Sequence, residues 1–125
     1  MNGKMDETEK KNLYNSAWNH WGSTSQIDIL IEEMAELTLA ILGTRRNGVT
    51  YSYAFSEEIA DVIICLEQIE TRMKDFPLSL SQGTLWDQVL EIKEMKLERL
   101  KNRLMEDIER NLPEGIADTI TDQVR

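Results

Sequence analysis

Two short acidic pairs are the part of this chain whose residue types and spacing could do chemistry. Glu33 and Glu36 are three positions apart, and Glu58 and Asp61 repeat this spacing. Residues three apart lie on one face of a helix, about one turn from each other. Carboxylate oxygens are hard ligands that suit Mg²⁺, Mn²⁺ or Ca²⁺ better than Zn²⁺. Two helices that face each other with such pairs would form a pocket for one or two magnesium ions, with room left for phosphate oxygens.

Apolar residues surround both pairs along the chain. They fill most of positions 29–42 and of positions 59–66, where Asp61 interrupts them. A helix that is apolar nearly all round is typical of a buried helix, and buried carboxylates need compensating cations. We therefore interpret the pairs as a metal site. The alternative is that the acids lie on the solvated faces of an ordinary helical bundle, as runs of charge usually do.

Two other metal chemistries fit the sequence poorly. A di-iron bundle would use a Glu-x-x-His pattern, whereas the one histidine, His20, lies outside both pairs. A calcium loop places its acids in a loop around a central glycine, whereas these acids lie inside predicted helices. The interpretation that remains is magnesium, with manganese as a substitute.

Composition limits the class of protein and its partners. At 125 residues, the chain is long enough for one domain of modest core, for which oligomerisation would hide more apolar surface. A net charge of −9 disfavours nucleic acid and anionic membranes as main partners. A single cysteine suits a reducing compartment, so we expect a cytoplasmic protein. The longest apolar run, Val62–Leu66, is too short to span a bilayer.

The periodicity of apolar residues predicts an all-α fold with four main helices, at about residues 10–20, 26–42, 53–76 and 84–110. We expect one domain over residues 1–125, with a helical core at about 10–110 and a tail at 111–125 that is a short helix or disordered. Homo-oligomerisation would complete the bundle. The expected helix ends are Gly22 and Gly43 as stops, a cap among Ser23, Thr24 and Ser25, Ser56 as a cap, and Pro77 as a stop.

The fourth predicted helix has an apolar stripe and a basic row. The stripe consists of Trp86, Leu90, Leu97, Leu100, Leu104 and Ile108. Several of these residues repeat every seven positions, as in a coiled-coil seam. Lys96, Arg99 and Arg103 line one side of the same helix, with Lys93 beside them and Arg110 further along. This row is either a solvated face or a set of cations that holds a triphosphate tail.

The acidic pairs also carry a family resemblance. Residues 32–37 read Glu-Glu-Met-Ala-Glu-Leu, and residues 57–62 read Glu-Glu-Ile-Ala-Asp-Val. This doubled motif resembles the signature of the MazG-like nucleoside triphosphate pyrophosphohydrolases, an all-α superfamily, and most of all its phage-encoded branch. Trp21 and Gly22 followed by Gln26, and the segment at 96–100, are similar to that branch as well. The resemblance covers about residues 14–104.

The resemblance implies an enzyme that hydrolyses a nucleoside triphosphate to the monophosphate and pyrophosphate. It implies magnesium held by Glu33, Glu36, Glu58 and Asp61, and a homodimer or homotetramer. Glu32 would orient or deprotonate the attacking water, or else lie at the surface. Glu57 precedes the second pair in the same way.

Several other residues have both a functional and a structural interpretation. Trp21 and His20 would help to form a nucleobase pocket, or Trp21 would be core; for Trp18 a surface position is favoured. Arg45 and Arg46 would touch phosphate or be solvated. We expect two further residues to be structural, namely Arg72 and the core residue Cys65.

A competing hypothesis comes from another class of protein. The chain would then be a non-catalytic helical interaction module, with its acids exposed to solvent and its heptad stripe used for dimerisation. Magnesium-dependent release of pyrophosphate from a nucleotide separates the two hypotheses.

Overall fold

The computed structural model describes residues 3–48, 52–79 and 83–113. In these residues the chain forms four α-helices: α1 (Glu7–Trp21), α2 (Ser23–Arg46), α3 (Tyr53–Met73) and α4 (Leu85–Asn111). The only β-type pairing in the same residues is an isolated bridge between Pro77 and Thr84. The prediction of an all-α fold with four main helices is confirmed.

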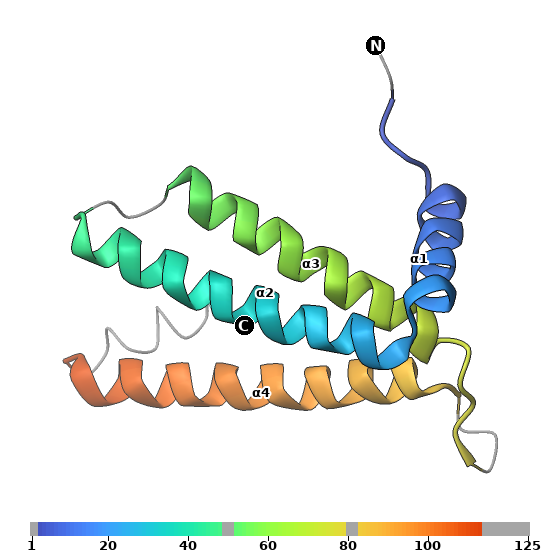
Figure 1. The fold of residues 1–125 in the computed structure, drawn as a ribbon. Coiled ribbons are helices and arrows are strands. Elements are labelled where there is room, and N and C mark those ends of the chain that lie inside the picture. The colour runs from blue at the N-terminus through green and yellow to red at the C-terminus, as the bar shows by residue number, and fades with distance from the viewer. Residues whose placement is uncertain (1–2, 49–51, 80–82, 114–125) are drawn as a thin grey trace. The chain divides into compact units, whose positions relative to one another are not determined.

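The helices belong to two compact units of the chain. The first unit is Met1–Phe76 and contains α1, α2 and α3; the second is Pro77–Arg125 and contains α4. Within the first unit, α2 and α3 run antiparallel along each other, and α1 packs near the start of α2 and the end of α3 (Figure 1). This hairpin brings the two predicted acidic pairs to the same seam.

The junction of α1 and α2 is a single glycine. The amide of Gly22 donates to the carbonyl of Trp18 at 2.9 Å, and its φ of 92° is in the left-handed region that favours glycine. Gly22 is thus the predicted stop of α1. It is also the N-cap residue of α2, without a side-chain cap, so the expected cap among Ser23, Thr24 and Ser25 is wrong. These residues already lie inside the first turn of α2 because no loop separates the two helices.

The end of α2 and the cap of α3 also differ from the prediction. α2 continues through Gly43, and its cap residue is Asn47. α3 begins at Tyr53, within the expected range, but Ser52 and not Ser56 is its cap and accepts the amide of Phe55 at 3.1 Å. The Thr44 hydroxyl is hydrogen bonded to the carbonyl of Ala40 at 2.9 Å and lies 3.4 Å from the Ser52 hydroxyl. These bonds hold the last turn of α2 against the first turn of α3.

Backbone bonds close the end of α3, whereas side-chain bonds cap the start of α4. α3 ends at Met73, before Pro77, so the proline is not its stop. Thr84 and Asp87 form a reciprocal capping box at the start of α4, with bonds of 2.8 and 3.3 Å. α4 ends at Asn111, close to the predicted end. Most of the predicted tail, residues 114–125, lies outside the described residues.

The expectation that the apolar helices are buried is wrong for the single chain. The buried residues of α2 are Gln26 and Thr44, and those of α3 are Cys65 and Gln68. Cys65 is a core residue, as predicted. Each helix of the hairpin has apolar residues on more faces than its partners in the first unit cover. Large apolar side chains that remain exposed include Ile31, Met34, Leu39, Leu42, Ile63, Ile64 and Leu66.

No helix in the described part of the chain is long and apolar enough to cross a membrane.

Candidate metal centre

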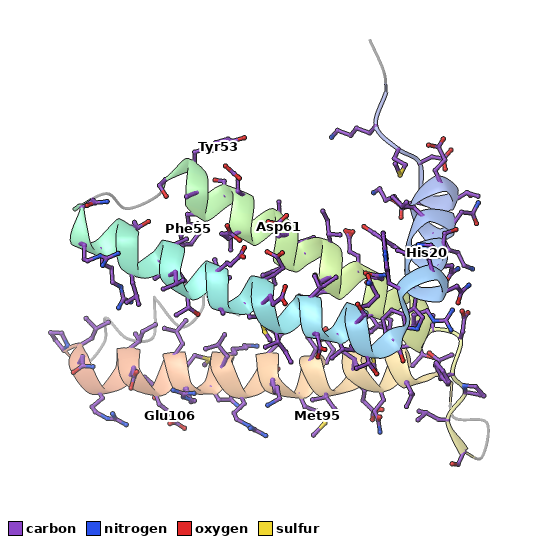
Figure 2. The ribbon with its side chains drawn as sticks, in the orientation of Figure 1. His20, Tyr53, Phe55, Asp61, Met95 and Glu106 are labelled. Atoms are coloured by element: carbon purple, nitrogen blue, oxygen red, sulfur yellow. The ribbon has the colours of Figure 1, made fainter. Side chains whose placement is uncertain are left out.

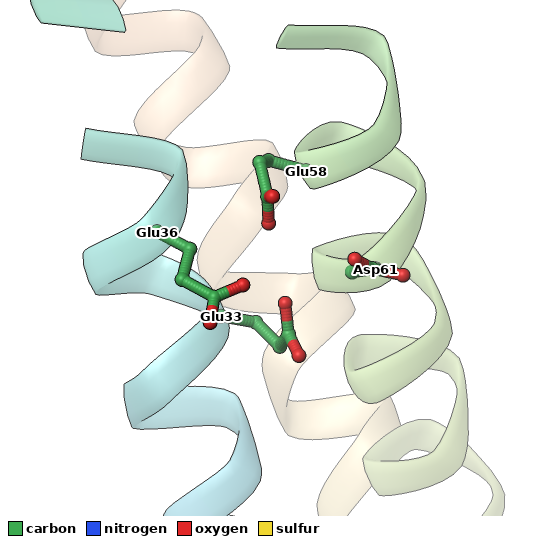
Figure 3. Close-up of side chains that lie close together, drawn as sticks. All are labelled: Glu33, Glu36, Glu58 and Asp61. Carbon is green, nitrogen blue, oxygen red and sulfur yellow. The ribbon is translucent and has the colours of Figure 1, made fainter. Parts of the chain in front are cut away.

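Four carboxylates converge between α2 and α3. Glu33 and Glu36 come from α2, and Glu58 and Asp61 come from α3 (Figure 3). One oxygen from each of the four lies within 4.8 Å of the others. The predicted metal ligands are therefore brought together by the fold, from segments that are 22 or more residues apart in the sequence.

The antiparallel hairpin explains this convergence. Each acidic pair spans about one helical turn and points into the seam between the helices. Because the helices run in opposite directions, the first acid of one pair lies level with the second acid of the other. Glu33, Glu58 and Asp61 are half-buried there, whereas Glu36 is exposed.

The four acids have no cation of their own in the structure. Among residues 3–48, 52–79 and 83–113, none of them forms an ion pair with a lysine or arginine. One oxygen of Glu33 and one of Glu58 are buried without any hydrogen-bond partner. A buried, unpartnered carboxylate oxygen is costly, and a divalent cation would satisfy it.

The pKa values of the cluster follow from this crowding. Burial raises the pKa of Glu33 to about 7, and the charges of Glu36, Asp61 and Glu58 add to the effect. Burial also raises the pKa of Glu58, with Glu36 as the next cause. The pKa of the Cys65 thiol is raised by burial first, and then by Glu33 and Asp61. Without a metal, the fold therefore favours protonation of part of the cluster.

The donor set fits a hard divalent cation. Mg²⁺ binds oxygen ligands in near-octahedral geometry and is usually held by carboxylates that leave places for water or phosphate oxygens. Four carboxylates in one group, two of them with a free buried oxygen, match this requirement. The cluster is a candidate site for Mg²⁺ or Mn²⁺.

The other predicted site residues of the first unit lie outside this group of four. Glu32 and Glu57 are exposed. Arg45 and Arg46 are exposed in the last turn of α2. Their proposed contacts with water or phosphate stay predictions.

The aromatic residues near the end of α1 differ from expectation. Trp21 is 61% exposed, so the alternative that placed it in the core is wrong. Its ring meets that of the exposed His20 (labelled in Figure 2) edge to face at 5.1 Å. Trp18 is half-buried, and the Arg72 guanidinium lies over its ring at 5.6 Å. Arg72 also donates to Asn15 Oδ1 at 3.4 Å. These contacts agree with the structural role expected for Arg72.

The predicted basic row lies on α4, in the second unit. Lys96, Arg99 and Arg103 are all exposed. Lys93 and Lys96 line a shallow apolar groove with Val89, Ile92, Leu97 and Leu100. Met95 and Glu106 project from the same side of α4 (Figure 2). A role of this row in binding triphosphate stays a prediction.

Two buried glutamines were not predicted as site residues. Gln26 and Gln68 are hydrogen bonded to each other across the α2–α3 seam at 2.9 Å. The sequence does contain a signal for them, because Gln26 precedes Glu33 by seven residues and Gln68 follows Asp61 by seven. A spacing of seven keeps residues on one helix face.

Comparison with known protein families, with curated proteins and with solved structures gives no match to this chain.

Proposed function

We propose that this protein is a magnesium-dependent hydrolase that converts a nucleoside triphosphate to the monophosphate and pyrophosphate. The observation that carries the proposal is the group of four carboxylates, two of which have a buried oxygen without a partner. The doubled motif that contains these acids and its resemblance to MazG-like enzymes give the reaction. Mn²⁺ is expected to replace Mg²⁺.

Glu33, Glu36, Glu58 and Asp61 would hold the metal. When bound, Mg²⁺ supplies charge neutralisation at the phosphates and lowers the pKa of a water molecule. By holding the metal, the four side chains would set where the phosphate oxygens of the substrate can bind. Their negative charge also repels a free triphosphate, so the site selects the nucleotide as its magnesium complex. Glu32 remains the candidate to orient the attacking water.

The substrate-binding part of the proposal uses residues outside the cluster. Lys96, Arg99 and Arg103 would hold the triphosphate tail, with Arg45 and Arg46 as the next candidates. Trp21 and His20 are exposed and in contact with each other, so their rings are available to stack on a nucleobase.

The proposal is tested by a panel of ribo- and deoxyribonucleoside triphosphates with Mg²⁺, assayed for both monophosphate and pyrophosphate. We expect cleavage between the α- and β-phosphates, because the family that the motif resembles cleaves there. Orthophosphate and a diphosphate as main products would contradict this assignment.

We also propose that the protein is a homodimer or homotetramer and works in a reducing compartment such as the cytoplasm. The apolar side chains exposed on α2, α3 and α4 support association, since a second copy would remove them from water. Sedimentation at micromolar concentration would give the oligomeric state.

The same exposed apolar side chains also favour a second candidate function, a non-catalytic helical interaction module. Such a module needs no cation at the carboxylates. Complete absence of magnesium-dependent turnover over the whole nucleotide panel, together with stable dimerisation, would favour this alternative.

A further inference from the structure

The contact between Gln26 and Gln68 is the most buried polar contact between α2 and α3. Gln68 Nε2 donates to Gln26 Oε1 at 2.9 Å and to the Tyr14 carbonyl at 3.4 Å. The two side chains are 6% and 7% exposed. Every leucine, isoleucine and valine in the described residues is more exposed than either glutamine. The centre of the hairpin seam at this end is therefore polar.

This polar contact is not explained by stability alone. Gln26 Nε2 is buried and has no hydrogen-bond partner, so one donor of the pair is left unsatisfied. Two apolar side chains of the same size would avoid this cost. In helical seams, single buried polar residues are known to fix the relative register of helices at a cost in stability.

The position of the pair relative to the carboxylates indicates what register it fixes. Gln26 and Glu33 are seven residues apart on α2, and Asp61 and Gln68 are seven apart on α3. Seven residues correspond to about 10 Å along the helix axis and return to the same face. When the glutamines meet at one level, Glu33 and Asp61 are therefore brought level as well.

A second polar contact lies on the other side of the carboxylates. Thr44 follows Glu36 by eight residues, Ser52 precedes Glu58 by six, and the two hydroxyls are 3.4 Å apart. The metal ligands thus lie between two polar contacts that both join α2 to α3. Ser52 of the second contact also caps α3, whereas the glutamine pair caps no helix.

A defined register matters here for two physical reasons. The side chains that flank the carboxylates are apolar. Because apolar contacts have no preferred direction, they tolerate small shifts of one helix along the other. The carboxylates repel each other and favour such a shift when no cation is present. A shift of one residue moves a ligand by about 1.5 Å along the axis, and Mg²⁺ demands near-ideal octahedral geometry.

We propose that Gln26 and Gln68 are positioning residues, whose hydrogen bond holds α2 and α3 at the register that brings the four carboxylates together. This inference rests on the proposed function for the identity of the bound cation. It assigns no contact with substrate to either glutamine.

The test compares two variants of the full chain with the wild type. Q26M/Q68M keeps side-chain length and removes both amides, so we expect thermal stability equal to or above that of the wild type. Mn²⁺ alone, titrated by electron paramagnetic resonance, should bind this variant about tenfold more weakly than the wild type.

Ile69→Ala is the control, since it removes an apolar group next to Gln68. It should lower stability but keep Mn²⁺ affinity within about twofold, because the polar contact remains.

A second measurement reports the register without any metal. Nitroxide labels at the exposed positions Thr38 and Ser56, in a Cys65→Ala background, give the distance distribution between α2 and α3. We expect the distribution to shift or broaden in Q26M/Q68M and to stay as in the wild type in Ile69→Ala.

The outcomes separate this inference from the proposed function. Wild-type Mn²⁺ affinity in Q26M/Q68M overturns the positioning role, even if the label distances change. If the wild type itself neither binds Mn²⁺ nor releases pyrophosphate, the proposed function fails. In that case the label distances alone test whether the glutamine pair fixes the register. An unchanged distance distribution in Q26M/Q68M would show that it does not.

Discussion

The first unit contains two groups of carboxylates, and they differ in whether other side chains form ion pairs or hydrogen bonds with them. One group lines a surface hollow of about 350 Å³ between α1 and α3. There Lys10 lies 3.0 Å from Glu7, Lys74 lies 2.7 Å from Glu70, and the Tyr14 hydroxyl donates to Glu67. The other group is the candidate metal centre, whose four acids have no such partner among the described residues.

The contrast is sharpest on α3, which contributes to both groups. Glu67 and Glu70 belong to the paired group, and Glu58 and Asp61 to the unpaired one, within a single helix. In the hollow, the hydrogen bond and charge of Glu7 raise the pKa of Lys10, so the pair favours its ionised form. In the metal centre, burial and neighbouring acids raise the pKa of Glu33 to about 7. The acids of the hollow have partners within the first unit, whereas the acids of the candidate metal centre would be neutralised by a bound cation.

The largest effect should come from exchanging one unpaired acid. Asp61→Asn removes a ligand charge with little change in volume, and we expect kcat/KM to fall by more than about a hundredfold, since metal assistance supplies several kcal/mol. The helical circular dichroism should be unchanged. The matched control is Glu70→Gln, an acid of the same helix that is paired with Lys74. Near-normal activity in purified Asp61→Asn would refute the metal assignment for this residue.

The basic row of α4 should have the next largest effect. A triphosphate adds about four negative charges to a centre that already has four carboxylates, so further cations are needed. Lys96→Ala or Arg103→Ala should each cost about 1–3 kcal/mol of transition-state stabilisation, measured from kcat/KM. Arg110, which already contacts Asp107 at 3.4 Å, is the control and should matter little. If both variants keep the wild-type kcat/KM, the basic row is a solvated face. Arg45 and Arg46 would then be the next candidates to bind the phosphates.

Binding of magnesium should stabilise the fold. A ligand that binds only the native state contributes about 2.7 kcal/mol at a concentration of 100 Kd, and the effect grows with concentration. Differential scanning fluorimetry with millimolar Mg²⁺ should show the rise in Tm for the wild type and for Glu70→Gln, but not for Asp61→Asn. A wild-type Tm that is indifferent to Mg²⁺, with and without nucleotide, would count against a specific site.

The smallest expected effect is the pH dependence of stability without metal. The pKa of Glu33 is raised in the folded state from 4.5 to about 7, so the folded chain holds more protons than the unfolded chain between these values. The free energy of unfolding should therefore fall as pH rises through this window. Urea titrations in a chelating buffer, at pH 4.5 and pH 7.5, would measure the fall. It should be smaller in Glu33→Gln; an equal fall in this variant would assign the effect to other groups.

Much of the site was predictable from sequence because its determinants are local. Two pairs with a spacing of three, each inside a helical pattern, present their carboxylates on one face of each helix. They meet where an antiparallel hairpin has the right register. The helices themselves follow from apolar periodicity, and the four expected helices are present. The start of α4 at the Thr84 capping box was likewise close to its predicted position.

The errors in the prediction concern caps and burial, which depend on contacts between different helices. Ser56 is as good a cap as Ser52 in isolation, and the choice is made by the contact of Ser52 with Thr44 from another helix. Gln26 and Gln68 are buried, whereas Ile31 and Ile64 of the same two helices are exposed. This reverses the usual rule that apolar side chains are buried and polar side chains exposed. This burial could not be predicted from the sequence, because it depends on how α2 and α3 are aligned in the hairpin, and that alignment is set by tertiary packing.

The one-residue junction at Gly22 also restricts how this chain can vary in length. Because α1 ends and α2 begins on either side of this glycine, an insertion or deletion there cannot be absorbed by a loop. An added residue would change the direction and the rotation of α1 relative to α2. The carbonyl of Tyr14 and the ring of Trp18 would then move away from Gln68 and Arg72, which they contact now. Length changes are therefore expected to be excluded from this junction by selection, even where substitutions on the outer face of α1 are neutral.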